Sequence, residues 1–249
     1  MVTMLIPIEG VPMVLPGNDL AALLIEAIDK QKVGIKYGDI LVVCQKVVSR
    51  AEGRVRKLSE VEPSAEALEF ASAHDKDPAV VELALLEASE ILRKKDGHLI
   101  TRTGPGFVAA NSGIDCSNQA AEGDATLLPE DSDKSALGLM SRLAAHYETE
   151  VGVIISDTFG RAWRLGQIDL AIGCAGLLPI DDREGGRDWA GRELEHTALA
   201  VADQLAAAAG IAMKKDAGVP AVLVRGSGAE LGDGSAIELL RPPEDDLFT

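Results

Sequence analysis

The sequence predicts a mixed α/β fold of the α+β kind, and three observations predict it. Short runs rich in Val, Ile and Leu, such as residues 40–48 and 151–155, have the β-branched density of buried strands. Segments with capping residues and apolar residues at helical spacing lie between these runs. The two kinds of element alternate only roughly, with no internal repeat or linker. We therefore expect one domain over residues 1–249, in which any subdomain boundary is left open.

The chain opens with a strand, a helix and a second strand. The apolar residues 5–8 predict a short strand. Asn18 or Asp19 then caps a helix over residues 20–28, whose leucines share one face. A continuous apolar strand is expected at residues 40–48.

Two helices and a hairpin are expected next. A short helix covers residues 66–73, and Asp77-Pro78 supplies the N-cap and first position of a helix over residues 79–94. Strands at residues 99–103 and 107–109 flank a Gly-Pro-Gly turn, which is the pattern of a hairpin.

A third helix and two strands follow. Asp131 or the serine after it caps a helix over residues 133–147. The strand at residues 151–155 ends where Asp157 is expected to open a turn. Residues 168–178 are apolar and Gly-rich, which predicts a buried strand closely approached by another backbone.

The last part of the chain contains a loop, a long helix and a strand. Residues 181–191 form a charged, Gly-rich loop whose length suggests function or mobility. The longest helix is expected at residues 192–213, where many alanines would let another helix pack closely. A final strand is expected at residues 219–224, and an irregular tail at residues 241–246.

Composition excludes several classes of protein. The net charge of −16 argues against binding nucleic acid through a basic face. No apolar stretch reaches about 18 residues, so no membrane span is indicated. The N-terminus lacks signal-peptide features, so a cytoplasmic protein is expected. Three scattered cysteines indicate neither a disulfide framework nor a zinc site.

Standard nucleotide-binding and hydrolase motifs are missing from the sequence. It has no G-x-x-x-x-G-K-[ST], no G-x-G-x-x-G after the first strand, no G-x-S-x-G and no H-E-x-x-H. We therefore expect a fold of neither the Rossmann nor the P-loop type. Any nucleotide site must be assembled from separated loops.

Polar residues suited to metal and phosphate follow the strand at residues 151–155. Asp157 and Thr158 offer hard oxygen donors for Mg²⁺ or Mn²⁺, and Arg161 and Arg164 suit phosphate or carboxylate groups. This combination fits a protein that handles a nucleoside triphosphate. On these residues alone, a strand followed by a turn and solvated arginines remains an equal alternative.

Two other polar stretches fit the same hypothesis. Gln45 and Lys46 interrupt an apolar run, where polar residues are out of place unless they face a ligand or lie where the strand leaves the sheet. Residues 111–118 are small and polar and follow a strand directly. Their backbone could bend around a phosphate or a metal, although small polar loops are common.

Five segments, in order over nearly the whole chain, resemble the coenzyme F-420-0:L-glutamate ligase (gamma-glutamyl ligase) family. They are residues 42–54, 111–118, 154–166, 189–195 and 218–226. The resemblance implies a GTP-dependent, GDP-forming ligase that adds L-glutamate to F-420-0 in coenzyme F-420 biosynthesis, with γ-linkage for later additions. It also implies two divalent cations, Mg²⁺ or Mn²⁺, with K⁺ left open, and an intertwined homodimer.

The resemblance also suggests roles for particular residues. Asp115 and Asp157 match ligands of the first cation, and Thr158 matches a ligand of the second. The residues that match GTP contacts are Val11, Pro12, Met13, Val14, Gln45, Lys46, Arg50, Asn118, Lys214, Lys215 and Asp216. Arg161, Arg164 and Arg192 are candidates for binding substrate carboxylates or phosphates, with surface ion pairing as the alternative.

The chain departs from the family pattern at two places. Arg50 stands where a lysine is usual, which keeps the charge and changes the geometry. At Lys214-Lys215-Asp216, some members supply an acidic or amide metal ligand, which a lysine cannot be. Either Asp216 ligates the second cation here, or Lys215 contacts the phosphates.

The chemistry expected of the residues agrees with the resemblance. Joining a carboxylate to an amine requires activation, which phosphorylation by GTP would provide through an acyl phosphate. This reaction needs little side-chain nucleophilic chemistry, and no catalytic Ser, Cys or His constellation is evident. A metal-dependent phosphohydrolase and a non-catalytic deazaflavin- or nucleotide-binding homologue remain as alternatives.

Overall fold

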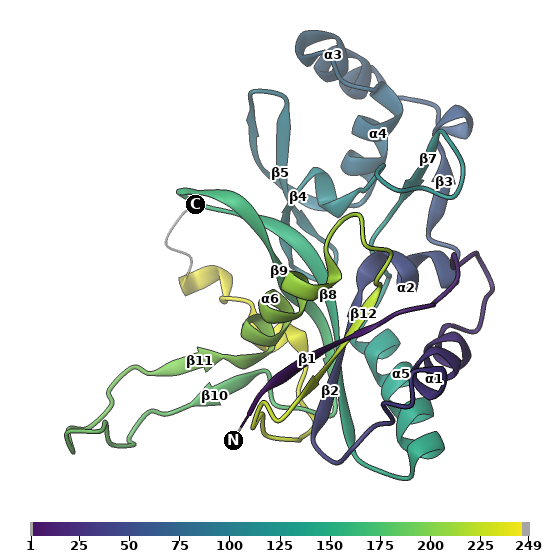
Figure 1. The fold of residues 1–249 in the computed structure, drawn as a ribbon. Helices are drawn as coiled ribbons and strands as arrows, with labels where there is room; N and C mark the ends of the chain where they lie inside the picture. Colours follow the sequence, from purple (N-terminus) through teal and green to yellow (C-terminus); the bar gives the residue numbers. More distant parts are fainter. Residues whose placement is uncertain (1, 246–249) are drawn as a thin grey trace.

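A five-stranded mixed sheet forms the centre of the computed structural model, which describes residues 2–245 (Figure 1). Its strand order is β1-β12-β2-β8-β9, and only the β2–β8 pair is parallel. The strands are β1 (Met4–Ile8), β12 (Ala221–Arg225), β2 (Asp39–Cys44), β8 (Val151–Arg161) and β9 (Arg164–Ala175).

Helices cover both faces of this sheet. Ile40 to Val43 in the central β2 are all fully buried, which requires cover on both sides. Helix α6 (Val201–Met213) packs against β9, β12 and β1, whereas α5 (Ser132–Tyr147) packs against β8, β9 and α1 (Leu20–Lys30). Gly173 allows the close approach of α5, because a Cβ there would lie 2.4 Å from the Ser132 carbonyl oxygen. The main core therefore lies between the sheet and these helices.

A smaller layer lies beyond one edge of the central sheet (Figure 1). It contains the sheet β4-β5-β6 and a small apolar cluster around Ala67, Val81 and Leu99. Its elements are α3 (Ala65–His74), α4 (Pro78–Leu86), β4 (Ala88–Lys95), β5 (His98–Thr103) and β6 (Val108–Ala110). The pair β3 (Val55–Lys57) and β7 (Asp124–Thr126) links it to α2 (Gln45–Ala51).

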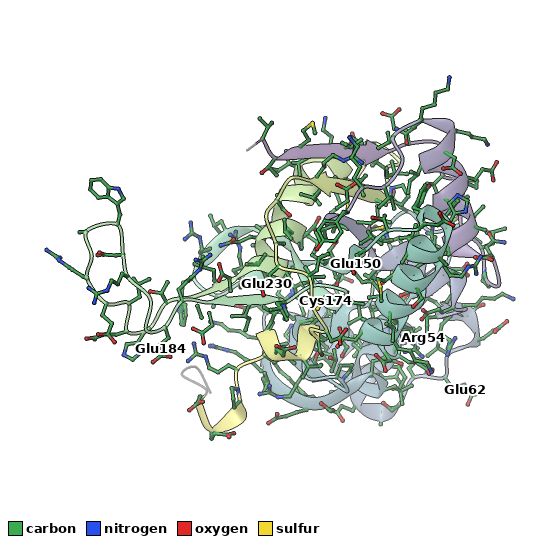
Figure 2. All side chains as sticks on the ribbon, turned by 90° about the horizontal axis from the view of Figure 1, so that it is seen from below. Arg54, Glu62, Glu150, Cys174, Glu184 and Glu230 are labelled. Carbon is green, nitrogen blue, oxygen red and sulfur yellow. The ribbon has the colours of Figure 1, made fainter. Side chains whose placement is uncertain are left out.

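An extended arm projects from the body of the molecule (Figures 1 and 2). Strands β10 (Ile180–Asp182) and β11 (Ala198–Ala200) pair at its base. Glu184 lies on the arm, and the Trp189 side chain is fully exposed there. Residues 183–197, which we call the arm, therefore make little contact with the rest of the chain.

Four short 3-10 helices complete the described part of the fold. They are η1 (Leu58–Glu60), η2 (Asn111–Gly113), η3 (Ala236–Leu239) and η4 (Pro243–Asp245). The expected irregular tail thus contains one short helical turn, and residue 246 lies outside the described residues. Within residues 2–245, no helix is long and apolar enough to span a membrane.

The mixed α/β class and several helix starts are confirmed. The Asp19 side chain caps α1 by accepting from the Ala22 amide, Asp77 caps α4, and Asp131 caps α5. The hairpin of β5 and β6 is also confirmed.

Two predicted elements were wrong because an apolar run does not distinguish a buried strand from a buried helix. The strand expected at residues 40–48 ends at Cys44, and α2 begins at Gln45, with Val47 and Val48 packed in the core. The helix expected at residues 79–94 ends at Leu86. The sequence after it pairs with β5 as β4, so tertiary pairing outweighs helix propensity there.

Two boundaries were also wrong. Asp157 does not open a turn, because β8 continues through it to Arg161 in a long hairpin with β9. The helix expected from residue 192 begins only at Val201, because the preceding residues form the arm and β11.

Candidate active site

One cavity of about 750 Å³ collects the residues that the sequence assigned to nucleotide and cations. Their segments are far apart in the chain and meet between the start of α2, the middle of β8 and the end of α6. The predicted residues that line it are Val11, Pro12, Met13, Val14, Gln45, Lys46, Arg50, Asp115, Asn118, Asp157, Thr158, Lys214, Lys215 and Asp216.

The parallel pairing of β2 and β8 explains part of this convergence. Cys44, the last residue of β2, pairs in register with Ser156 of β8. Parallel strands deliver the residues that follow them to the same edge of a sheet. The first turn of α2, with Gln45 and Lys46, therefore lies beside Asp157 in β8.

An ion pair links α2 to the loop of residues 114–118. The Lys46 Nζ lies 2.7 Å from Asp115 Oδ2 and donates to the Ser117 carbonyl oxygen at 2.6 Å. The Ser117 amide donates to Asp115 Oδ1 at 2.7 Å. Burial opposes ionisation of Asp115, but Lys46 and Ser117 together lower its pKa. Asp115 is therefore held as a carboxylate at the cavity wall.

Arg50 is a buried cation at the same cavity, with 5% of its surface exposed. Its guanidinium donates to the Asn118 carbonyl oxygen, and a second nitrogen lies 3.1 Å from the Met13 sulfur. Burial lowers the pKa of Arg50, and its Nε is buried without a hydrogen-bond partner. Buried charges without full pairing are costly, so this group is suited to an anionic ligand.

Asn118 and Lys214 both have positive φ angles where the cavity loops meet. Asn118 has φ 48° and Lys214 has φ 50°, which is unfavourable for a lysine. The Asn118 Nδ2 donates to the Lys215 carbonyl oxygen at 3.0 Å, which joins the two loops. Such strain is concentrated at ligand sites in proteins.

Acidic and hydroxyl groups lie together on β8 and β9. Burial raises the pKa of Asp157 to about 6, opposed by the Thr158 amide and reinforced by the negative charge of Asp115. Thr158 Oγ1 donates to Asp169 Oδ1 at 2.6 Å and accepts from Lys215 Nζ at 3.1 Å. The cavity therefore has an acidic wall and a basic rim.

The acidic wall has donors that suit a hard divalent cation. Asp115, Asp157 and Thr158 supply carboxylate and hydroxyl oxygens. Burial, with a smaller contribution from the charge of Asp115, raises the pKa of Asp157, and a cation bound beside it would favour its ionised form. Within residues 2–245, no three His, Cys, Asp or Glu side chains converge to form a complete metal site. A cation here would need oxygens from a phosphate or water to complete its coordination, as Mg²⁺ commonly does.

The three arginines suggested for substrate binding do not line this cavity. Arg161 lies in the β8–β9 hairpin and donates to the Leu165 carbonyl oxygen at 3.1 Å. Arg164 is exposed at the start of β9, and Arg192 is exposed on the arm. The structure does not bring these three residues together with the predicted nucleotide and cation residues.

Sequence reasoning missed several polar residues of the cavity, including Ser156 and Asp169. The Ser156 hydroxyl is buried without a partner, and Asp169 accepts the hydrogen bond from Thr158. Asp169 had a detectable signal, because it is a charged residue between Ile168 and Leu170 at the start of an apolar run. The argument applied to Gln45 and Lys46 would have found it.

A second cavity, of about 870 Å³, lies on the α5 side of the sheet. Its polar residues include Glu130, Asp131 and Asp133, but it contains none of the predicted site residues. The Asp133 carboxylate already accepts hydrogen bonds from the protein, from the Cys174 amide at 2.8 Å and the Ala236 amide at 3.0 Å. The first cavity combines basic side chains, carboxylates and a strained loop, and this combination is typical of a ligand site.

Comparison with known proteins places the chain among ligases. Residues 10–226 match the family described as F420-0:Gamma-glutamyl ligase, and the chain belongs to this family. It is 47% identical to the coenzyme F420:L-glutamate ligase of Methanothermobacter thermautotrophicus, over 98% of both chains.

Other relatives match over similar lengths. The coenzyme F420:L-glutamate ligase of Methanopyrus kandleri is 43% identical over 97% of this chain and 96% of its own. That of Archaeoglobus fulgidus is 42% identical over 97% of this chain and 94% of its own. The resemblance noted from five sequence segments is therefore confirmed at the level of the family.

Proposed function

We propose that this protein is a GTP-dependent, GDP-forming ligase that joins L-glutamate to F420-0, and that the cavity at Lys46, Asp115 and Asp157 is its active site. The observation that carries the proposal is the convergence of basic and acidic groups in that one cavity. A nucleoside triphosphate held by divalent cations needs both kinds of group within a few ångströms.

The basic residues have positions suited to binding phosphate. Lys46 and Arg50 both extend from α2, and Lys215 approaches from the opposite loop to within 3.1 Å of Thr158 Oγ1. Ammonium groups act as point charges for phosphate, and a guanidinium can donate two hydrogen bonds. These residues would hold the triphosphate between α2 and the loop after α6.

The acidic residues would hold the cations. Asp115 and Asp157 offer carboxylates, and Thr158 offers a hydroxyl oxygen. Mg²⁺ or Mn²⁺ bound there would neutralise negative charge on the phosphates during transfer. The Lys46 ammonium, which now pairs with Asp115, would be free to contact phosphate once a cation binds that carboxylate.

The proposed reaction forms an amide through an activated carboxylate. The terminal phosphate of GTP is transferred to the carboxylate of F420-0, which gives an acyl phosphate and GDP. The glutamate amine attacks the acyl carbon, loses a proton, and the tetrahedral intermediate expels inorganic phosphate. Little nucleophilic help from side chains is needed, so the protein acts mainly by positioning and charge stabilisation.

Nucleotide consumption distinguishes this ligase from a metal-dependent phosphohydrolase. In the presence of Mn²⁺, we expect multiple-turnover GDP release only when both F420-0 and glutamate are present, and no release with a chelator. Multiple-turnover GDP release without glutamate would favour water as the nucleophile. Binding of GTP with no product under any condition would favour a non-catalytic homologue.

We also propose that the protein forms a homodimer. The arm with its exposed Trp189 and the exposed Leu165 at the β8–β9 hairpin tip offer apolar surface outside the body of one chain. A second copy would cover this surface. Light scattering at micromolar concentration should give a dimer mass, whereas a monomer mass would contradict this proposal.

A further inference from the structure

Thr158 and Asp169 face each other across the β8–β9 pair on the wall of the cavity. They are directly opposite in the strand register, and the Thr158 hydroxyl donates to Asp169 Oδ1 at 2.6 Å. A hydroxyl that donates to a carboxylate at this distance forms a strong, charge-assisted hydrogen bond. The single proton of Thr158 is therefore directed at Asp169.

A hydrogen bond that Thr158 accepts fixes the remaining geometry of its oxygen. Lys215 Nζ lies 3.1 Å from Thr158 Oγ1, and an ammonium can only donate. A hydroxyl has one proton and two lone pairs. Thr158 donates its proton in the hydrogen bond to Asp169 and accepts from Lys215 with one lone pair, so its other lone pair remains for a ligand in the cavity.

Helix α6 leaves room for the Asp169 carboxylate at Gly210. A Cβ at Gly210 would lie 2.5 Å from Asp169 Oδ2 and 3.0 Å from its Cγ. Any larger residue at this helix position would displace the carboxylate. Within the described residues, no Lys, Arg or His side chain is found within ion-pair distance of Asp169, so its partner on the protein is the Thr158 hydroxyl.

We infer that Asp169 is a positioning residue that orients the Thr158 oxygen toward a divalent cation in the cavity. Asp169 holds the hydroxyl proton away from the cation, so that the Thr158 oxygen presents a lone pair to the cation. This inference rests on the proposed function, because the cation is part of that proposal. Residues that form a hydrogen bond with a metal ligand orient that ligand and raise the affinity of the site for the metal.

The test is Mn²⁺ affinity, measured by electron paramagnetic resonance in the presence of GTP. Asp169→Ala should raise the Mn²⁺ dissociation constant by about tenfold or more. Asp169→Asn keeps an oxygen that accepts the hydroxyl proton, so its dissociation constant should stay within about threefold of wild type. Asp203→Ala, which removes a carboxylate that accepts from the Ala171 amide on the same strand, is the matched control and should leave Mn²⁺ affinity unchanged.

A Thr158→Val background tests whether Asp169 acts through Thr158. The carboxylates of Asp115 and Asp157 remain there, so Mn²⁺ binding remains measurable. Adding Asp169→Ala to Thr158→Val should change the dissociation constant less than about twofold, because the proton to be held is gone.

Three results would overturn the inference. An equal loss in Asp169→Ala and Asp169→Asn would show that charge, not hydrogen bonding, matters. A full loss in the Thr158→Val background would show that Asp169 acts without Thr158. A lowered melting temperature with unchanged Mn²⁺ affinity would show a structural role. If wild-type protein with GTP bound no Mn²⁺, the inference and the proposed cation site would both fail, which separates that outcome from the other three.

Discussion

The Lys46 ammonium lies 2.7 Å from the Asp115 carboxylate and so joins the first turn of α2 to a loop far along the chain. Both side chains are mostly buried in the wall of the cavity, with 16% of the Lys46 surface and 27% of the Asp115 surface exposed. The pair is thus less screened by solvent than a surface ion pair. It places one candidate phosphate-binding group against one candidate cation ligand before any ligand is present.

Replacing Lys46 should weaken nucleotide binding. Lys46→Met removes the ammonium and leaves Asp115 without its cation, and we expect GTP affinity to fall by about 10- to 100-fold. Isothermal titration with GTP and Mg²⁺ measures this. Lys30→Met is the matched control, because Lys30 forms an exposed ion pair with Glu26. The Lys30→Met protein should bind GTP with wild-type affinity. Unchanged GTP affinity in Lys46→Met would remove Lys46 from the site.

Asp157 should destabilise the cation-free protein at neutral pH. Its pKa in the folded state is about 6, above the value of about 3.9 for an unfolded aspartate. The unfolded state therefore loses its proton first, so stability falls as pH rises from about 4 to 6 and stays lower above that. Asp157→Asn should stabilise the cation-free protein by about 1–3 kcal/mol at pH 8.

This stabilisation should disappear below about pH 4, where Asp157 is protonated in both states. Thermal unfolding in the presence of a chelator, followed from pH 4 to pH 8, measures the difference. A constant difference between wild type and Asp157→Asn across this range would contradict the assigned pKa. The same variant should lose ligation, because it removes a cation ligand.

Gly210 should be intolerant of a side chain. Gly210→Ala forces the Asp169 carboxylate to move, and we expect a loss of about 1–3 kcal/mol in the free energy of unfolding. Gly138→Ala in α5 is the control, because a Cβ there meets no atom within 4 Å. It should stabilise the protein by about 0.5–1 kcal/mol through helix propensity. Urea unfolding of both variants gives the comparison, and equal stabilisation would refute the packing at Gly210.

The loop after α6 allows two roles to be separated. Lys215 reaches Thr158 in the cavity, which favours a contact with phosphate over a role for Asp216 as a cation ligand. Lys215→Ala should therefore raise the GTP requirement and leave the Mn²⁺ requirement unchanged. Asp216→Ala should alter neither strongly. If Asp216→Ala instead raised the Mn²⁺ requirement sharply, Asp216 would be the cation ligand.

Local signals predicted much of the fold but not the changes of element within apolar runs. Caps such as Asp19 and Asp131 marked helix starts correctly, because the capping hydrogen bond is local. The change from β2 to α2 at Gln45 could not be predicted in this way. Residues 40–48 are apolar throughout apart from Gln45 and Lys46, and burial on both sides suits either element.

The other errors in the predicted elements arose from strand pairing between separate segments of the chain. Residues 88–95 carry the composition of a helix end but pair with β5, and that choice depends on residues after them in the chain. Residues 192–197 of the arm likewise have no local signal that separates them from a helix start. The family resemblance identified loops that line one cavity in the structure, and the binding roles of their residues stay predictions. The pairing of Asp169 with Thr158 could not be predicted from local signals, because it depends on the register of β8 and β9.

The most direct test of the proposed function is the mass of the deazaflavin product. Wild-type protein, Asp115→Asn and Asp157→Asn are each incubated with F420-0, L-glutamate, GTP and Mn²⁺, and the products are analysed by mass spectrometry. We expect one or more glutamyl additions with wild type and none with either variant, while circular dichroism shows all three folded. Glutamyl addition by both variants at the wild-type rate, or by wild type without GTP, would contradict the proposed active site and reaction.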